Sequence, residues 1–88
     1  MNTDDILRER GLRYGAFVIQ ADLSQKFKDV LIYGGSIDSM QPYQKEALEM
    51  ILHKIARIAN GDPNYTDSWK DIAGYAQLVV DILEGRGR

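Results

Sequence analysis

Hydrophobic residues recur at steps of three and four along most of this chain, which is the spacing of one helix face. The clearest stripe precedes Asn60-Gly61, a pair typical of a helix C-terminus. Its members are Ala47, Leu48, Ile51, Leu52, Ile55, Ile58 and Ala59. Asp38 and Gln41 have the spacing of a capping box, and Pro42 fits a first helical turn. We therefore expect a helix of about 20 residues, roughly 30 Å long, ending at Asn60.

Two further stripes predict helices over residues 15–33 and 66–83. The first stripe is Phe17, Ala21, Leu23 or Ser24, Phe27, Val30, Leu31 and Tyr33, and the second is Trp69, Ile72, Ala73, Ala76, Val79, Val80 and Leu83. Thr66 or Asp67 is the expected cap of the last helix. Gly74 lies inside that helix, where it either permits a close helix contact or leaves room for a ligand. Turn-forming residues at 62–65 predict a tight loop before it.

A short first helix is expected over residues 4–10, capped by Thr3 and stopped by Gly11. No second strand candidate accompanies the β-branched run at 30–33. The predicted fold is therefore all-α, a small helical bundle of three main helices plus a short N-terminal helix. We expect one domain over residues 1–88, with an arm at 1–14, a core at 15–84 and a loose tail at 85–88.

Composition narrows the functional classes. The chain of 88 residues has no cysteine, which excludes disulfides and thiolate metal sites. Its net charge of −2 gives no support for general nucleic-acid binding. The N-terminus is too polar for a signal peptide, and no apolar run approaches the roughly 18 residues of a membrane helix. A cytoplasmic protein without a membrane partner is expected.

Apolar residues outside the main stripes predict self-association. Leu78 and Ile82 lie beside Tyr75, away from the main stripe of the last helix. A three-helix core cannot easily cover both sides, so we expect a homodimer or higher homo-oligomer with the third and fourth helices at the contact. The alternative is a monomer in which the first helix and the loop at 34–37 cover this surface.

Polar residues follow one side of each of the two last helices. Glu46, Glu49, His53 and Arg57 share a face, bordered by Lys54, and Asp67, Asp71 and Tyr75 are spaced by one turn. One interpretation is a solvated surface with weak ion pairs. The other is a ligand groove, or a divalent metal held by the two acid pairs. A single histidine without cysteine argues against zinc.

The N-terminal half adds Arg10, Arg13 and Tyr14. The guanidinium group of arginine binds phosphate oxygens well through its several N–H donors. Taken one at a time, however, each of these residues is explained by surface solvation. The glycines match no phosphate-binding loop, and no nucleophile, base and acid form a catalytic set. The candidate ligand-binding residues are Arg10, Arg13, Tyr14, His53, Lys54, Arg57, Trp69 and Tyr75, with Tyr14, Tyr75 or Trp69 stacking on a base.

The run HKIARIANGDPNYTDSWKDIAGYAQLV, residues 53–79, resembles a family of small uncharacterised proteins of bacteriophages and prophages. The likeness extends upstream through RERGLRYGAF and YQKEALEMI, and it covers about three quarters of the chain. The same pattern resembles the nucleotide-modification-associated domains of phage genomes. These resemblances imply a phage setting and a link to nucleotides, without a known reaction.

A weaker likeness is to the MazG-type all-α nucleoside triphosphate pyrophosphatases, which hold magnesium between acid pairs on two helices. It implies a Mg²⁺ site in which Glu46 and Glu49 match the first pair, and Asp67 and Asp71 the second. The second pair departs from that pattern, because its spacing is four rather than three. Lys54 and Arg57 also stand where further acids are expected, which favours anion binding without catalysis.

Three hypotheses follow. The first is a binding module for a nucleotide-like phosphorylated ligand that sequesters a host signalling nucleotide as counter-defence. The second is an enzyme that releases pyrophosphate with Mg²⁺. The third is a protein-interaction domain that inhibits a host enzyme.

Overall fold

The computed structural model describes residues 2–87 and contains no β-strand within them. The described helices are α1 (Thr3–Tyr14), α2 (Phe17–Tyr33), α3 (Pro42–Asn60) and α4 (Thr66–Leu83), with a 3₁₀ turn, η1 (Ser36–Ser39), before α3. This confirms the all-α bundle of three main helices and an N-terminal helix. Met1 and Arg88, which belong to the predicted arm and tail, lie outside the described residues.

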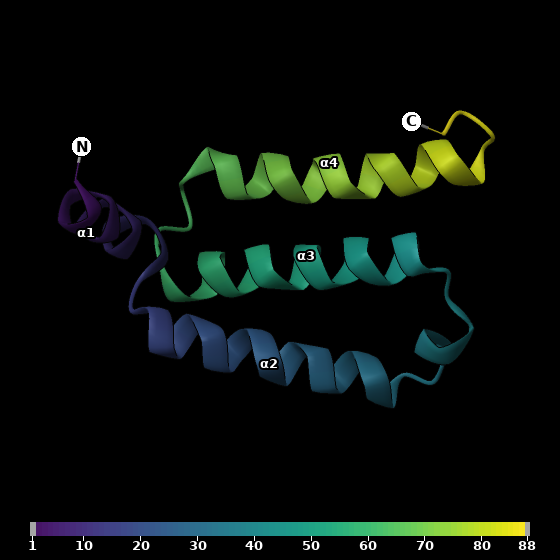
Figure 1. Cartoon of the computed structure of the whole chain (residues 1–88), viewed down its shortest axis with the longest axis horizontal. Helices are drawn as coiled ribbons and strands as arrows, with labels where there is room; N and C mark the ends of the chain where they lie inside the picture. Colours follow the sequence, from purple (N-terminus) through teal and green to yellow (C-terminus); the bar gives the residue numbers. More distant parts are fainter. Residues whose placement is uncertain (1, 88) are drawn as a thin grey trace.

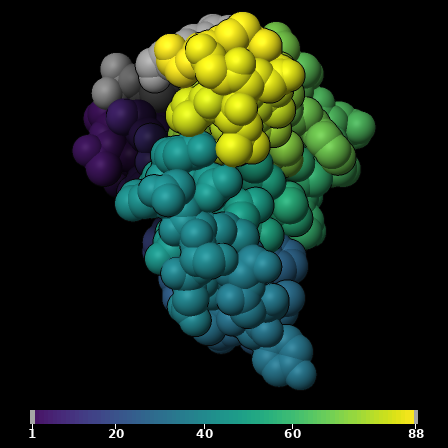
Figure 2. Space-filling view, turned by 90° about the vertical axis from the view of Figure 1, so that its right-hand side faces the viewer, coloured from purple at the N-terminus to yellow at the C-terminus, as the bar shows by residue number. Residues whose placement is uncertain are grey.

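The three long helices form a layer with α3 in the middle. Helix α3 packs against α2 on one side and α4 on the other, while α1 lies at one end (Figure 1). Viewed from the opposite end, the ends of α4, α3 and α2 follow one another in a line (Figure 2). The Cα extents are 42 × 29 × 22 Å. Because α2 and α4 do not close around α3, both faces of the layer remain open.

The hydrophobic core is consequently small. Within residues 2–87, the buried hydrophobic residues are Ala47 and Ala56, both on α3. Helix α2 turns Gln20 and Ser24 toward the interior. Three residues of its expected apolar stripe, Phe17, Val30 and Tyr33, remain exposed. The expectation that this stripe packs into the core is wrong for these three residues, because the side of α2 that carries Gln20 and Ser24 packs against α3.

Several helix ends differ from the sequence expectation. Helix α1 continues through Gly11 to Tyr14, and its cap is Asn2, whose Oδ1 accepts from the Asp5 N–H at 2.9 Å. A continuous chain of helical hydrogen bonds overrides the isolated glycine. Helix α4 follows Tyr65, whose side chain makes no capping bond, rather than a Thr66 or Asp67 cap.

The capping box of α3 is also shifted along the chain. Gln41 is the cap, and its backbone N–H donates to the Gln44 side chain at 2.9 Å. Asp38 instead belongs to η1. A Cβ added to Gly74 meets nothing within 4 Å, so this glycine does not serve a close helix contact.

The corner between α1 and α2 is fastened to the end of α3. Asn60 Nδ2 donates to the backbone oxygens of Tyr14 and Ala16, both at 3.0 Å, and the Asp62 N–H donates to the Arg13 oxygen at 2.7 Å. Gly15 has φ +77° and leaves no space for a Cβ beside Asn60. This clamp fixes Tyr14 against the C-terminal half of α3.

Arg86, shortly after the end of α4, contacts carboxylates at the C-terminal end of the chain's last helix and just beyond it. An Arg86 side-chain nitrogen contacts the carboxylates of Asp81 at 3.1 Å and Glu84 at 2.8 Å. Gln77 also donates to Asp81, at 2.7 Å. Within residues 2–87, no helix combines the length and apolar character needed to cross a membrane.

Candidate functional site

A groove of about 590 Å³ opens where α1, α2 and α3 meet. It is lined by Leu7, Arg10, Gly11, Tyr14, Gly15, Ala16, Phe17, Gln20, His53 and Arg57. The clamp at Asn60 brings the end of α1 over α3, so the groove gathers side chains that are more than 40 positions apart in the sequence. Four of the predicted ligand-binding residues are here: Arg10, Tyr14, His53 and Arg57.

The guanidinium of Arg57 stacks on Tyr14. Its Cζ lies 4.1 Å from the centre of the Tyr14 ring, a cation–π contact. Tyr14 is itself held by an edge-on contact with Tyr65, with ring centres 6.1 Å apart. Among residues 2–87, the buried Arg57 Nε has no hydrogen-bond partner. A buried donor without an acceptor is costly, so Arg57 is held in this position by its packing rather than by a hydrogen bond of Nε.

The charge of the groove is positive. Its lining includes two arginines and a histidine but no carboxylate. Within residues 2–87, neither Arg10 nor Arg57 forms an ion pair, whereas Arg13, Lys26 and Lys54 each have an acidic partner. Two free guanidinium groups at one site attract an anion.

His53 contributes a neutral donor to this groove. The Gln20 amide donates to His53 Nδ1 at 3.2 Å, so the ring proton of the neutral histidine is on Nε2. Burial lowers the pKa of His53 below its ordinary value, and the positive charges of Arg57, Lys54 and Lys28 lower it further. The ring is therefore neutral at pH 7, and an anion nearby raises its affinity for a proton.

The comparison with protein families covers nearly the whole chain. The model of a family described as Domain of unknown function (DUF6378) matches residues 3–83. The chain belongs to the DUF6378 family. No curated protein and no solved structure matches it. The matched DUF6378 region includes all three helices that line the groove.

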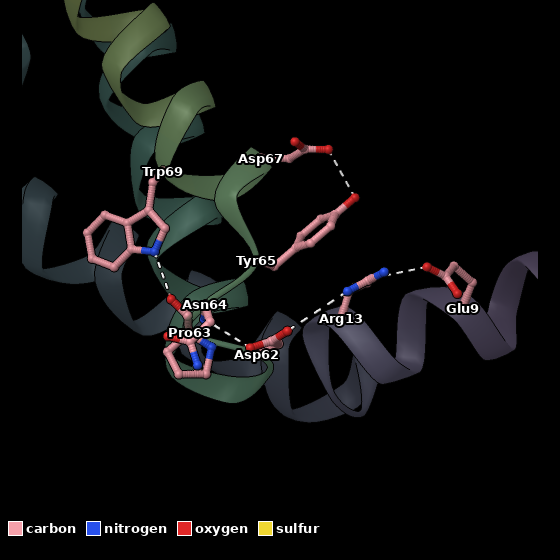
Figure 3. Close-up of polar contacts among 8 residues, drawn as sticks. All are labelled: Glu9, Arg13, Asp62, Pro63, Asn64, Tyr65, Asp67 and Trp69. Carbon is pink, nitrogen blue, oxygen red and sulfur yellow. Dashed lines mark hydrogen bonds and ion pairs between the residues drawn. The ribbon is translucent and has the colours of Figure 1, made fainter.

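Arg13, in contrast, forms ion pairs with acidic residues of the same chain. Its side chain contacts Glu9 at 3.0 Å and Asp62 at 3.9 Å, as Figure 3 shows, and it lies 4.4 Å from the centre of the Tyr65 ring. These contacts join α1 to the loop before α4. The predicted phosphate-binding role of Arg13 is not supported by its position, because two carboxylates already neutralise it.

Trp69 and Asp67 also make local contacts at the start of α4 (Figure 3). Trp69 Nε1 donates to the Pro63 oxygen at 2.9 Å, and the Tyr65 hydroxyl donates to Asp67 at 3.0 Å. The bond to Asp67 raises the pKa of Tyr65 above its ordinary value. Trp69 is therefore not brought to the groove as a base-stacking ring.

Lys54 and Tyr75 lie between α3 and α4. Lys54 Nζ pairs with Asp71 at 3.0 Å, and the lysine side chain is only 11% exposed. Tyr75 lines a separate hollow together with Glu46, Leu78 and Ile82. Both residues are thus separated from the groove that holds Arg57.

The predicted carboxylate set is not assembled as a metal centre. Within residues 2–87, no three histidine, cysteine, aspartate or glutamate side chains gather closely enough to hold a metal ion. Asp67 accepts from Tyr65 and Asp71 pairs with Lys54. Glu46 and Glu49 therefore do not combine with these two acids into a four-carboxylate site within one chain.

Phe17 and Gln20 line the groove but are not among the site residues predicted from the sequence. Periodicity places Phe17 in the apolar core and Gln20 on the polar surface, whereas Phe17 is 75% exposed and Gln20 is buried. A signal for Gln20 exists, because Gln20 and Ser24 precede Phe27 and Leu31 by seven residues each. That spacing places all four on the side of α2 that faces α3.

Proposed function

We propose that the groove binds a nucleotide-like phosphorylated ligand. The observation that carries this proposal is Arg57, whose guanidinium is held on Tyr14 and has no ion-pair partner within residues 2–87. Arg10 supplies a second free guanidinium at the same groove. Arginine is the residue best suited to phosphate oxygens, because its donors are arranged as a fork.

Other residues of the groove lining could contact the base and the neutral polar groups of a nucleotide. His53 offers Nε2–H as a neutral donor, and Phe17 offers an exposed ring on which a base stacks. The volume of about 590 Å³ lies within the range of about 300–1,000 Å³ typical of small-molecule sites. Tyr14 has one ring face covered by Arg57, so Phe17 is the better stacking partner.

Binding without turnover is the mode that this proposal favours. The groove lining has no carboxylate to act as a base, and its one histidine is fixed through Nδ1 by Gln20. A protein of this kind acts by withdrawing its ligand from solution. Sequestration of a host signalling nucleotide by a phage-encoded cytoplasmic protein remains the prediction that follows from the sequence resemblance.

The two alternative functions have weaker support. Magnesium-dependent pyrophosphate release requires the carboxylates to meet, and Asp71 is already paired with Lys54. Inhibition of a host enzyme is compatible with the exposed apolar residues, but no residue arrangement favours it over ligand binding. Both remain predictions from the sequence.

Isothermal titration calorimetry tests the proposal. The full chain is titrated with inorganic phosphate, pyrophosphate, nucleoside phosphates and cyclic dinucleotides, and with nucleosides that lack phosphate. We expect heat only with phosphorylated compounds, and stronger binding when a base is present. No heat with any phosphorylated compound at millimolar concentration contradicts the proposal.

A matched pair of variants locates the site. Arg57→Gln removes the stacked charge, and we expect affinity to fall by about tenfold or more, since a hydrogen bond to a charged group contributes about 1.5–3 kcal/mol. Lys70→Gln removes one exposed charge on α4, outside the groove, and should leave affinity unchanged. Equal losses in both variants would indicate unspecific attraction by net charge.

A further inference from the structure

We propose that a second copy of this chain covers the apolar face of the helical layer. We define the apolar face by six residues of α3 and α4: Leu48, Ile51, Ile55, Trp69, Ala76 and Val80. A hollow of about 300 Å³ occupies one part of this face, and Leu48, Ile51 and Ala76 are in its lining. The proposal is a twofold dimer in which the two layers pack face to face.

Helix geometry places these residues on one side of the layer. Leu48, Ile51 and Ile55 are spaced by three and four, so they align along α3. Arg57 follows Ile55 by two positions, which is about 200° around the helix. The apolar face and the phosphate groove are therefore on opposite sides of α3.

On α4 and α2, too, residues two positions apart point to opposite sides of the layer. Val80 aligns with Ala76, whereas Leu78 lies about 200° away and lines the opposite hollow with Glu46. On α2, Ile19 is two positions from Phe17, which lines the phosphate groove. Ile19 is 54% exposed and extends the apolar face across the third helix of the layer.

The exposed area of the chain matches what a dimer requires. The accessible surface is 6231 Å² for a mass of 10.0 kDa, whereas a compact monomer of that mass exposes about 5,200 Å². The excess of about 1,000 Å² exceeds the roughly 800 Å² that each partner buries in a standard interface. The Cα radius of gyration, 14.7 Å, likewise exceeds the roughly 12 Å of a compact domain of this length.

The chemistry of the face selects a second copy over other occupants. None of its six residues is charged, so packing these positions against the same positions of a second copy buries no charge from them. A membrane surface is usually bound by a helix with lysine or arginine along its polar edge and a single apolar stripe. Here the apolar residues spread over three adjacent helices instead, as in the interior of a two-layer helical protein.

This arrangement differs from the contact expected from the sequence. Leu78 and Ile82 remain partly exposed in the structure, whereas the monomer alternative expects the first helix and the loop at 34–37 to cover them. These two residues, however, lie on the side of the layer that carries Arg57. In the proposed dimer both phosphate grooves face outward, one for each chain, and neither is shared across the interface.

Analytical ultracentrifugation of the full chain at micromolar concentration tests the proposal. We expect a mass of twice one chain for the wild type. Val80→Glu should shift the chain to the monomer mass, while Leu78→Glu should remain dimeric. The two side chains are 42% and 43% exposed on the same helix, so they form a matched pair. A wild-type monomer, or a monomer produced by Leu78→Glu alone, overturns the proposal.

Cysteine labelling supplies a readout that does not depend on breaking the dimer. The sequence contains no cysteine, so Val80→Cys and Leu78→Cys each introduce a single thiol. We expect a maleimide to react at least tenfold more slowly at position 80 than at position 78 in the folded protein. Equal rates would show that the apolar face is open. A wild-type monomer protected at position 80 only by lipid vesicles would assign the face to a membrane surface and likewise overturn the proposal.

Discussion

The Arg57 guanidinium lies over the Tyr14 ring, with 4.1 Å between Cζ and the ring centre. This contact joins the last turn of α1 to α3 and holds a cation in place without an acid. An arginine neutralised by a carboxylate, such as Arg13, must give up that partner before it binds phosphate. Arg57 has no such cost, and that difference underlies the first prediction.

Tyr14→Leu should weaken phosphate binding while Tyr14→Phe should not. The phenyl ring of phenylalanine keeps the cation–π contact, whereas leucine leaves Arg57 free to rotate. Because such contacts contribute about 0.5–2 kcal/mol, we expect a loss of roughly 2- to 30-fold in affinity for the leucine variant. Calorimetry measures the loss, and circular dichroism checks that both variants fold. An equal loss with phenylalanine would assign the effect to the hydroxyl group.

His53 should titrate below pH 6.5 in the free protein and higher when an anion is bound. It is the one histidine of the chain, so its ring signals in NMR are unambiguous. Burial and the nearby positive charges lower its pKa, and a bound phosphate opposes them. A titration with and without a phosphodiester ligand, whose own charge stays constant from pH 5 to 8, measures the shift. An unchanged pKa would place the ligand away from His53.

The same histidine should make stability depend on pH. Because folding lowers its pKa, the unfolded chain binds more protons between the folded pKa and about 6.5. The free energy of unfolding should therefore rise with pH through that window and reach its full value above it. Urea denaturation at intervals from pH 5 to 8 measures the slope. His53→Gln should flatten this part of the profile, and a variant with the wild-type slope would contradict the prediction.

Three glycines should respond differently to replacement by alanine. Gly15→Ala combines a backbone region open almost only to glycine with a clash against the Asn60 oxygen, so we expect a loss of at least about 3 kcal/mol. Gly35 also has positive φ but open space around it, so its alanine variant should lose about 1–2 kcal/mol.

For Gly74 we expect alanine to change stability in the opposite sense. It lies inside α4 with nothing near the position of a Cβ, so Gly74→Ala should stabilise the fold by up to about 1 kcal/mol. Chemical denaturation of the three variants gives the ranking. A Gly15 variant as stable as the Gly35 variant would show that the clamp at Asn60 is not closely packed.

Asp71→Asn should reduce stability without changing ligand affinity. The variant leaves Lys54, whose side chain is largely buried, without its acidic partner. We expect a loss of about 0.5–1 kcal/mol, because the aspartate itself is half exposed and its charge is screened. Calorimetry with the best phosphorylated ligand should give the wild-type affinity. A strong loss of Mg²⁺-dependent binding or turnover would instead favour the carboxylate site predicted from the sequence.

The sequence by itself determined the helices and part of the site. Apolar spacing together with Asn60-Gly61 and Pro42 predicts α3 closely, because these signals act within a few residues of one another. Arg10, Tyr14, His53 and Arg57 were recognisable as candidates from residue type and spacing. The uncapped start of α4 and the passage of α1 through Gly11 were not predicted, since tertiary packing outweighs weak local preferences.

Only the tertiary structure decided which charges remain available. Arg13 and Lys54 look like Arg57 in the sequence, but Asp71 of α4 pairs with Lys54. Asp62 likewise approaches Arg13 from the loop before α4, in addition to Glu9 one turn away on α1. The burial of Gln20 and the close approach of Gly15 to Asn60 depend likewise on how α1 and α2 meet α3. Such contacts are set by the relative placement of whole helices, and hydrophobic periodicity specifies which face is apolar without specifying what covers it.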